Sequence, residues 1–295
     1  MQTKRLWMAF ILGLLASFGP FTIDMYLPAF PIMAEDFETT ISNVQLSLTA
    51  CLFGLAVGQL FVGPLSDIYG RRKPLLIGLI TYAVSSIFCI VSNSIWVFII
   101  FRFLQGASGA AGIVIARAIV RDLYSGSQLT KFFALLMLVS GVAPIFAPIF
   151  GGQLLKFTTW NGVFIVLTAL GCVMFLLVMF GLRETLPAER RATEGIAATF
   201  LSYRNLFKDR VFIGYAFAQG FVYASMFSYI SGSPFVLQNI YGLSPQQFSL
   251  FFAINGIGLI IATQTTGRLA GKIHERKMLM FGLGLASINS LFLFS

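Results

Sequence analysis

The chain has 295 residues, of which 57% are hydrophobic and only 11% are charged, and its mean hydropathy is +0.86. Soluble domains carry about 25% charged residues, so the composition excludes an ordinary soluble domain and indicates an integral membrane protein. Three cysteines, Cys51, Cys89 and Cys172, each fall within an apolar run. Their odd number and apolar surroundings argue against a disulfide framework or a metal site.

Nine apolar segments follow one another with short polar breaks, and each is long enough to cross a bilayer as a helix. Lys4 and Arg5 precede the first segment as in a signal peptide, but that segment is too long and further spans follow it. Little of the chain remains for strands, so the predicted fold class is an all-α membrane protein. The segments lie at about 6–33, 43–65, 75–93, 95–116, 131–155, 160–182, 211–237, 246–267 and 278–295.

The basic residues predict the orientation of these spans. With the N-terminus inside, 18 of the 20 Lys and Arg residues fall in inner segments, while Lys156 falls outside and Arg102 lies within a span. Cytoplasmic loops are enriched in Lys and Arg, so we expect a cytoplasmic N-terminus. The net charge of +9 is then explained by orientation and anionic lipid, which leaves no case for a nucleic-acid partner.

The longest break runs from Glu184 to Arg210 and carries Pro187 with a charge cluster, so it predicts a cytoplasmic linker. Its second part, Ile196 to Phe207, mixes Phe200, Leu201, Leu206 and Phe207 with polar residues. Both a helix on the membrane surface and a simple tether fit that pattern. The predicted domains are therefore a six-helix bundle (1–182), the linker (183–210) and a partial second bundle (211–295).

Asp24 is the only carboxylate that falls within a span, because the other ten acidic residues lie in loops or at helix ends. A charge inside the membrane is costly and is by default a functional-site hypothesis; the alternative is that Asp24 merely bonds a neighbouring helix. Arg102 lies about 12 Å into its span, and Asp24 lies about 16 Å from the same membrane face. The two charges are therefore matched in depth.

We expect Asp24 and Arg102 to face a central cavity, either paired or linked through Gln105. A carboxylate between a cation, which favours its charged form, and a desolvating environment, which favours its neutral form, can exchange a proton for a cationic solute. Several aromatic residues could line such a cavity or simply pack, namely Phe21, Tyr26, Tyr223 and Tyr229.

Glycine and proline spacings predict two local features. Gly54 and Gly58, at i and i+4, predict a close contact between helices. Pro144 and Pro148 predict a bend in the fifth span, because each proline removes a backbone donor.

An internal repeat joins two loops. The segments 63–73 and 267–277 agree at four positions when they are offset by 204 residues, which suggests the parallel half-repeats of transporters. In the first copy, Gly63 would allow a close helix approach or a tight turn, Asp67 would cap a helix or pair with a charge, and the cations would anchor the loop inside. A generic basic inner loop is the alternative.

The first copy resembles the signature loop of the major facilitator superfamily, with Gly63, Asp67, Gly70, Arg71 and Arg72 at its motif positions. Three further stretches agree with that resemblance. Arg102-Phe-Leu-Gln105-Gly106 looks like the R-x-x-Q-G motif of the superfamily, and Ala143–Gly152 looks like the motif of its antiporter members, with Pro144, Pro148, Gly151 and Gly152. Asp24–Pro28, together with Ala118–Tyr124, resembles the Bcr/CflA group of bacterial drug:proton antiporters.

The resemblance implies a transporter that works by alternating access, exporting lipophilic, often cationic drugs in exchange for protons across the bacterial inner membrane. It implies no enzyme activity and no cofactor beyond the proton gradient, and we expect a monomer in the lipid bilayer. The family has two six-helix halves, so the last three helices are expected to be missing; the family partner of Asp67 would lie there. Ala147 also replaces a glycine of the antiporter motif. The alternatives are a proton-coupled symporter of a small nutrient and a truncated, transport-inactive fragment.

Overall fold

The computed structural model describes residues 2–193, 195–196, 201, 203–204, 206–269 and 272–294, and the regular elements in this part are all helical. The predicted all-α fold class is therefore confirmed for the described chain. The helices are α1 (Gln2–Asp24), η1 (Leu27–Ala29), α2 (Phe30–Asp36), α3 (Ile41–Tyr69), α4 (Arg72–Ile90), α5 (Ile95–Leu123), α6 (Gly126–Leu154), α7 (Asn161–Gly181), η2 (Ala188–Arg190), α9 (Arg210–Phe235), η3 (Val236–Ile240), α10 (Pro245–Leu269) and α11 (Glu275–Phe294).

Eight stretches of the described chain are long and apolar enough to cross a membrane, and they coincide with the first eight predicted spans. Large apolar side chains on them are exposed, as lipid-facing residues would be; Met137 is 73% exposed and Phe180 is 77% exposed. The ninth predicted span coincides with α11, but the side chains of residues 289–295 lie outside the described part, so this span stays a prediction.

The chain divides into two compact units, residues 1–253 and residues 254–295. The second unit consists of the remainder of α10 and α11. The linker predicted at 183–210 includes residues outside the described part, among them Phe200, so the choice between a surface helix and a tether stays open.

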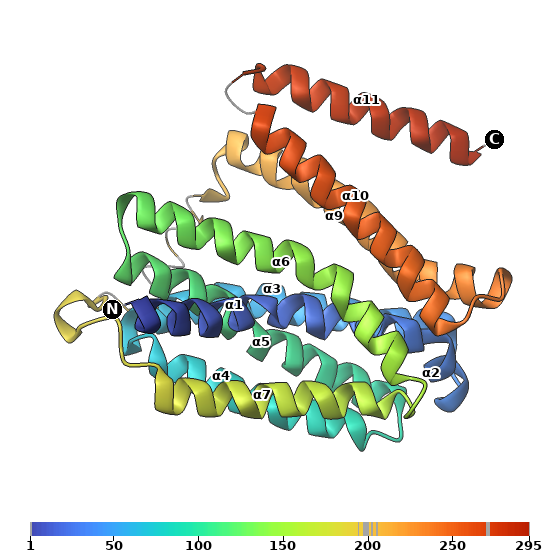
Figure 1. Ribbon diagram of the computed structural model, residues 1–295, viewed down its shortest axis with the longest axis horizontal. Coiled ribbons are helices and arrows are strands. Elements are labelled where there is room, and N and C mark those ends of the chain that lie inside the picture. The colour runs from blue at the N-terminus through green and yellow to red at the C-terminus, as the bar shows by residue number, and fades with distance from the viewer. Residues whose placement is uncertain are drawn as a thin grey trace. The chain divides into compact units, whose positions relative to one another are not determined.

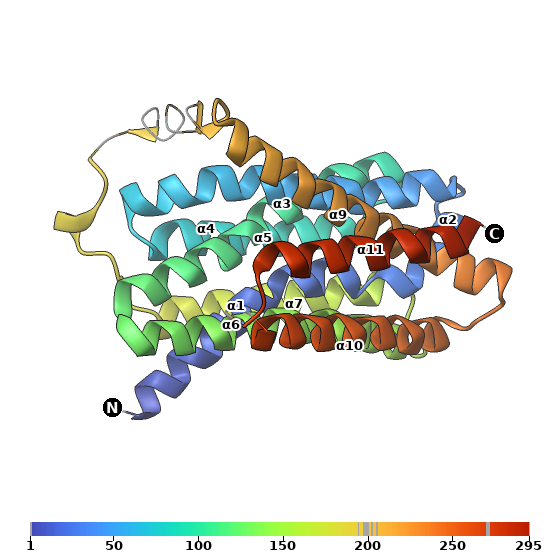
Figure 2. The same cartoon turned by 90° about the horizontal axis from the view of Figure 1, so that it is seen from above.

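Within the first unit, α5 packs against α1, α3 and α4, and α4 also packs against α7 (Figures 1 and 2). Helices α3 and α5 approach each other very closely. A Cβ added at Gly54 would lie 2.1 Å from the Phe103 carbonyl oxygen, and one at Gly58 would lie 2.2 Å from that of Ala107. Lipid offers helices no hydrophobic driving force to associate, so such close packing of small residues must hold them together. The predicted role of Gly54 and Gly58 is confirmed.

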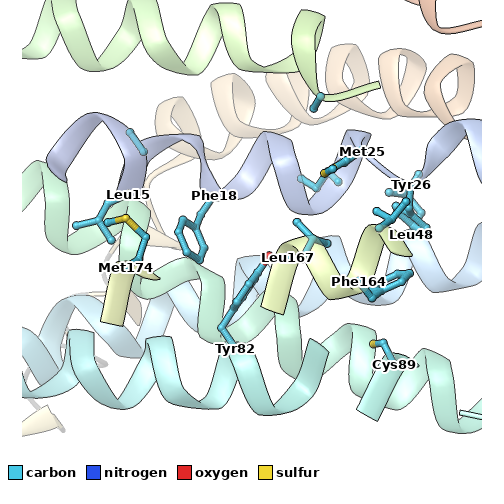
Figure 3. Close-up of a cluster of buried hydrophobic side chains, with 14 of the residues drawn as sticks. Leu15, Phe18, Met25, Tyr26, Leu48, Tyr82, Cys89, Phe164, Leu167 and Met174 are labelled. Carbon is cyan, nitrogen blue, oxygen red and sulfur yellow. The ribbon is translucent and has the colours of Figure 1, made fainter. Parts of the chain in front are cut away.

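Buried apolar side chains of α1, α3, α4 and α7 pack together, and the rings of Phe18, Tyr82 and Phe164 are among them (Figure 3). Phe18 of α1 and Tyr82 of α4 meet edge to face with ring centroids 4.8 Å apart. Phe98 of α5 and Phe164 of α7 do the same at 5.2 Å. This edge-to-face geometry places the positive edge of one ring against the negative face of the other.

The first span is not one continuous helix, as the apolar run predicts. Helix α1 ends at Asp24, a turn follows at Met25 and Tyr26, and the chain continues through η1 into α2. Pro28 explains part of this break, because it has no N–H to donate to the carbonyl of Asp24 four residues earlier. The break therefore separates α1 from α2 at the residue of greatest functional interest.

We predict that Gly58→Ala destabilises the protein although Gly63→Ala does not. A methyl group at Gly58 would clash with the backbone of α5, and such overpacking costs about 1–3 kcal/mol. At Gly63 the nearest atom to an added Cβ is Val114 Cγ1 at 3.9 Å, so the higher helix propensity of alanine should dominate. Thermal melting of both purified variants in detergent measures the difference, and equal melting temperatures would contradict this packing argument.

Candidate functional site

Asp24 lies at the C-terminal end of α1 and is only 5% exposed. Among the described residues, no hydrogen bond or ion pair involves its carboxylate. A buried carboxylate of this kind is expensive in hydrocarbon and calls for a partner, a proton or water. The position therefore differs from that of a residue that simply bonds the next helix.

Arg102 of α5 is fully buried at the same level. Its Nη1 donates to Gln105 Oε1, and its Nη2 donates to the carbonyl oxygen of Thr22 at 3.0 Å. The guanidinium also lies over the ring of Tyr26, 4.2 Å from its centroid, and 5.6 Å from the centroid of the Phe164 ring. Its Nε is buried without a hydrogen-bond partner in the described part of the chain.

The bond to Thr22 joins the cation to a helix end. The last four carbonyl groups of a helix lack intrahelical partners, and Thr22 is in the last turn of α1. That end also carries the negative pole of the helix dipole, which favours a nearby cation. The turn after Asp24 thus supplies the acceptor that stabilises Arg102.

A chain of polar contacts extends this site to α4. Gln105 Nε2 donates to Ser86 Oγ at 2.6 Å, and the hydroxyl groups of Thr22 and Tyr82 lie 2.7 Å apart. The network therefore links α1, α4 and α5. It includes three residues that the sequence analysis did not single out, Thr22, Tyr82 and Ser86. The spacing of Tyr82 and Ser86, two polar residues at i and i+4 in the apolar sequence of α4, could have indicated a polar face on this helix.

The structure brings Arg102 and Gln105 together, but among the described residues Asp24 neither pairs with Arg102 nor is linked to it through Gln105. Thr22 and Asp24 are two residues apart, so their side chains leave α1 about 200° apart. Arg102 lies on the side of Thr22 and Tyr26. The coupling roles of Asp24, Arg102 and Gln105 stay predictions.

The segment of α6 that resembles the antiporter motif lies against the break in the first span. Figure 1 shows the axis of α6 bending in its second half, where Pro144 and Pro148 lie within the helix. A Cβ added at Gly151 would be 1.8 Å from the carbonyl oxygen of Met25, and one at Gly152 would be 2.4 Å from Ser249 Oγ. Both glycines therefore permit contacts that any side chain would prevent.

Four side chains of the first unit donate to backbone carbonyls across the contacts of α9, η3 and α10 with α3, η1 and α6. We call these bonds the carbonyl strip. They are Gln45 Nε2 to Ser231 O (3.1 Å), Gln238 Nε2 to Pro28 O (3.1 Å), Gln246 Nε2 to Gly152 O (2.6 Å) and Ser249 Oγ to Pro148 O (2.7 Å).

The α3–α4 loop forms a second charged cluster. Arg71 is buried, and its guanidinium donates to Asp67 and, at 2.8 Å, to Asp122 Oδ2 at the end of α5. Burial works against the charge of Arg71, but the hydrogen bonds to Asp122 and Asp67 raise its pKa above the ordinary value. The predicted pairing of Asp67 with a charge is therefore confirmed.

Two glycines of this loop differ from each other. Gly70 has φ +85°, and a Cβ there would lie 2.5 Å from Glu184 Oε2, so this position requires glycine. Gly63 instead lies inside α3 with no close neighbour, so the expectation that it permits a tight turn or a close approach is wrong for this unit. Arg72 extends from the loop to the carbonyl oxygen of Met179 at 2.5 Å.

Glu184 binds the backbone of the same loop, a role that sequence reasoning did not detect. Its carboxylate accepts from the N–H groups of Arg71 (2.8 Å), Arg72 (3.1 Å), Thr185 (3.0 Å) and Leu186 (3.0 Å). Partial burial tends to raise its pKa, but these four bonds hold the pKa below the ordinary value. Glu184 and Asp122 are distant in sequence from the loop, so no local pattern could reveal the cluster.

Among the described residues, no group of three or more His, Cys, Asp or Glu side chains could hold a metal ion.

A family model settles the class of the chain. The model of the Major Facilitator Superfamily matches residues 9–295. The chain belongs to this superfamily. Membership identifies it as a membrane-spanning transport protein rather than an enzyme, in agreement with the expectation from sequence.

Relatives and solved structures agree with this assignment. A protein of Bacillus subtilis described as an uncharacterized MFS-type transporter, YdgK, is 50% identical over 97% of this chain and 71% of its own length. The bicyclomycin resistance protein homolog of Haemophilus influenzae is 35% identical over 96% of this chain and 71% of its own length. The multidrug resistance protein MdtL of Shewanella oneidensis is 28% identical over 92% of this chain and 69% of its own length.

The fold matches the crystal structure of a bacterial homolog to the human lysosomal transporter Spinster in an inward-facing and unoccupied conformation. The TM-score is 0.71 at 17% identity, and the match covers 92% of this chain. The chain spans only 64% of the length of that protein.

We predict that Glu184→Gln lowers thermal stability at pH 7 and that its difference from the wild type narrows in acid. The folded pKa of Glu184 lies below its ordinary value, which is about 4.3 for glutamate. The charged form therefore adds stability above that ordinary value, and this stability is lost as the pH falls through the folded pKa. Melting curves from pH 7 to pH 3 measure the effect, because the loss begins only below the ordinary value. Glu189→Gln, which removes an exposed charge from the same linker, is the control, and a pH-independent difference for Glu184→Gln would contradict the prediction.

We also predict that Arg102→Lys destabilises the protein more than Arg117→Lys. An ammonium cannot reproduce the planar guanidinium that bonds Gln105 and Thr22 and stacks on Tyr26. Losing one charge-assisted hydrogen bond costs about 1.5–3 kcal/mol. Arg117 is exposed on the same helix and serves as the matched control. Melting temperatures in detergent test this, and equal values for the two variants would argue against the network.

Proposed function

We propose that this chain mediates proton-coupled efflux of drugs by alternating access, with Asp24 as the group that exchanges a proton for the drug. The observation that carries the proposal is the buried carboxylate of Asp24, which has no hydrogen-bond or ion-pair partner in the described chain. The printed names of two relatives, a bicyclomycin resistance protein homolog and a multidrug resistance protein, support drugs as the substrate class.

In the proposed cycle, the cationic drug and the proton bind Asp24 in turn, never together. Deprotonated Asp24 attracts a lipophilic, cationic drug from the inside, because a buried carboxylate binds a cation strongly where water is scarce. A proton from the outside then neutralises the carboxylate, which removes this attraction and releases the drug. Asp24 lies at the negative end of α1, which disfavours its charged form until a cation arrives.

Arg102 and Gln105 act in this proposal by holding the end of α1. Arg102 is bonded to the Thr22 carbonyl, two residues before Asp24, and to Gln105. A change of charge at Asp24 therefore acts on a helix end that is tied to α5. The Nε of Arg102 has no hydrogen-bond partner in the described chain, so this N–H group can donate to water or to a solute.

The remaining assignments belong to the same proposal. The N-terminus lies in the cytoplasm of a bacterial cell, the α3–α4 loop with Gly63, Asp67, Gly70, Arg71 and Arg72 gates the inner side, and the α6 segment seals the outer side. The chain works as a monomer, with a six-helix bundle (1–182), a linker (183–210) and a second bundle (211–295). The proton gradient supplies the energy, with no cofactor.

We predict that Asp24→Asn abolishes pH-driven efflux. Asparagine keeps the size of the side chain but carries no proton to exchange, so transport of a cationic dye such as ethidium should fall at least tenfold. Everted membrane vesicles with an imposed pH gradient, containing this chain as it stands, measure it.

Glu35→Gln is the matched control, because it removes an exposed carboxylate from α2, just beyond the break. It should leave efflux unchanged at equal protein levels in the membrane. Undiminished, pH-coupled efflux by Asp24→Asn would rule out the proposed role of Asp24.

A further inference from the structure

A groove of about 480 Å³ lies between α3 and α4, away from the network of Arg102. Volumes of about 300–1,000 Å³ are typical of ligand sites. Val62 and Leu65 of α3 form one wall, Ile77 and Thr81 of α4 form the other, and α5 forms the floor. None of the residues assigned to proton or drug coupling lines it.

The groove results from the close packing on α5. Both α3 and α4 pack along α5 but make little contact with each other. The floor between them consists of Ala107, Ser108 and Ala111. These residues are small because the neighbouring helices approach α5 so closely; a Cβ at Gly78 would lie 2.5 Å from Ala111 Cβ. Side chains of that size cannot fill the space between the walls.

The interior of the groove is apolar. The hydroxyl of Ser108 donates to the carbonyl oxygens of Leu104 (2.8 Å) and Gln105 (3.0 Å) within its own helix. It therefore needs no hydrogen bond from a molecule bound in the groove. Ile77, on the wall, is 66% exposed. A hydrocarbon chain would cover this surface with little loss of polar contacts, because the hydroxyl of Ser108 is already bonded and only that of Thr81 remains on the wall.

The mouth of the groove is charged. Tyr69 and Lys73 line it there, and both are exposed. The salt bridges of the described residues both belong to Arg71, so Lys73 has no carboxylate partner among them. Thr81, at the other end, is eight residues along α4, or about 12 Å deeper. That depth is less than half of a hydrocarbon core of about 30 Å, so the groove extends from the membrane surface into one leaflet.

We propose that this groove binds an acyl chain of an anionic phospholipid, with the phosphate of the headgroup at Lys73. Lys near a membrane surface attracts anionic lipid, and burial of each methylene group adds to the binding. Lys73 would repel a cationic drug, and a groove of about 12 Å is too short for a spanning helix. A single lipid chain matches the depth, the apolar walls and the charge.

Native mass spectrometry of the purified chain tests the proposal, with phosphatidylglycerol and neutral phosphatidylcholine titrated separately. The wild type should retain phosphatidylglycerol more tightly than phosphatidylcholine. Lys73→Gln should weaken phosphatidylglycerol binding about fivefold and weaken phosphatidylcholine binding less, because the choline cation of that lipid offsets the charge of its phosphate. Thr81→Phe and Ser108→Leu fill the groove from its wall and its floor, and each should weaken both lipids.

Two matched controls should bind both lipids like the wild type. Lys131→Gln removes an exposed cation from α6, and Ile80→Phe enlarges the neighbouring, exposed position of α4. Melting temperatures confirm that each variant is folded.

Equal affinity of the wild type for both lipids would overturn the proposal. Unchanged phosphatidylglycerol binding in both filled variants would do the same, because it would leave only surface attraction to Lys73. Ethidium binding that is lost in the filled variants, with lipid binding intact, would assign the groove to drugs instead.

Discussion

The fully buried guanidinium of Arg102 must find its acceptors inside the membrane, and much of the first unit is arranged around this requirement. Hydrocarbon cannot solvate a cation, so the protein meets the demand with a side-chain amide, an aromatic face and a main-chain carbonyl. That carbonyl is available because α1 stops at Asp24. The end of α1 at Asp24, the turn at Met25 and Tyr26, and the separation of Asp24 from the cation thus belong to one arrangement. Asp24 remains uncommitted because the backbone satisfies Arg102.

Sequence periodicity was sufficient for the spans and for the contact at Gly54 and Gly58, since both depend on local composition and spacing. It failed at α1, because the apolar run continues past Asp24 and hides the turn. The partner of Arg102 could not be predicted from residue types, because the acceptor at Thr22 is a carbonyl that every residue carries. The cluster around Arg71 draws on Asp122 and Glu184, 51 and 113 positions away, and such distances leave no trace in a local motif. Gly63 illustrates the reverse error, in which a motif position suggested a contact that the packing does not contain.

Different kinds of interaction stabilise the two ends of the first unit, charged pairs at one end and neutral hydrogen bonds at the other. At the α3–α4 loop, a carboxylate–guanidinium cluster joins Asp67, Arg71 and Asp122, and the Glu184 carboxylate accepts from four main-chain N–H groups. Such charges respond to pH and to salt. Near the break in the first span, neutral amides and hydroxyls bond to carbonyls in the carbonyl strip, and Phe30 packs on Phe235 with ring centroids 5.9 Å apart. Interactions of the second kind are short in range and barely sensitive to ionic conditions.

The carbonyl strip has a consequence for how this protein tolerates genetic change. In each of its four bonds a side chain supplies the donor and the main chain supplies the acceptor. A point mutation can delete a donor such as Gln246, but no replacement at Gly152 removes the oxygen it binds. Point mutations can therefore delete the donors of these bonds but not the acceptor oxygens, although a side chain at Gly152 would disturb the contact sterically. A lost donor can be restored from any nearby position that reaches the same oxygen. Compensatory changes should accumulate among the polar residues of α3, η3 and α10, which supply the donors. The acceptors persist because every residue carries a main-chain carbonyl oxygen.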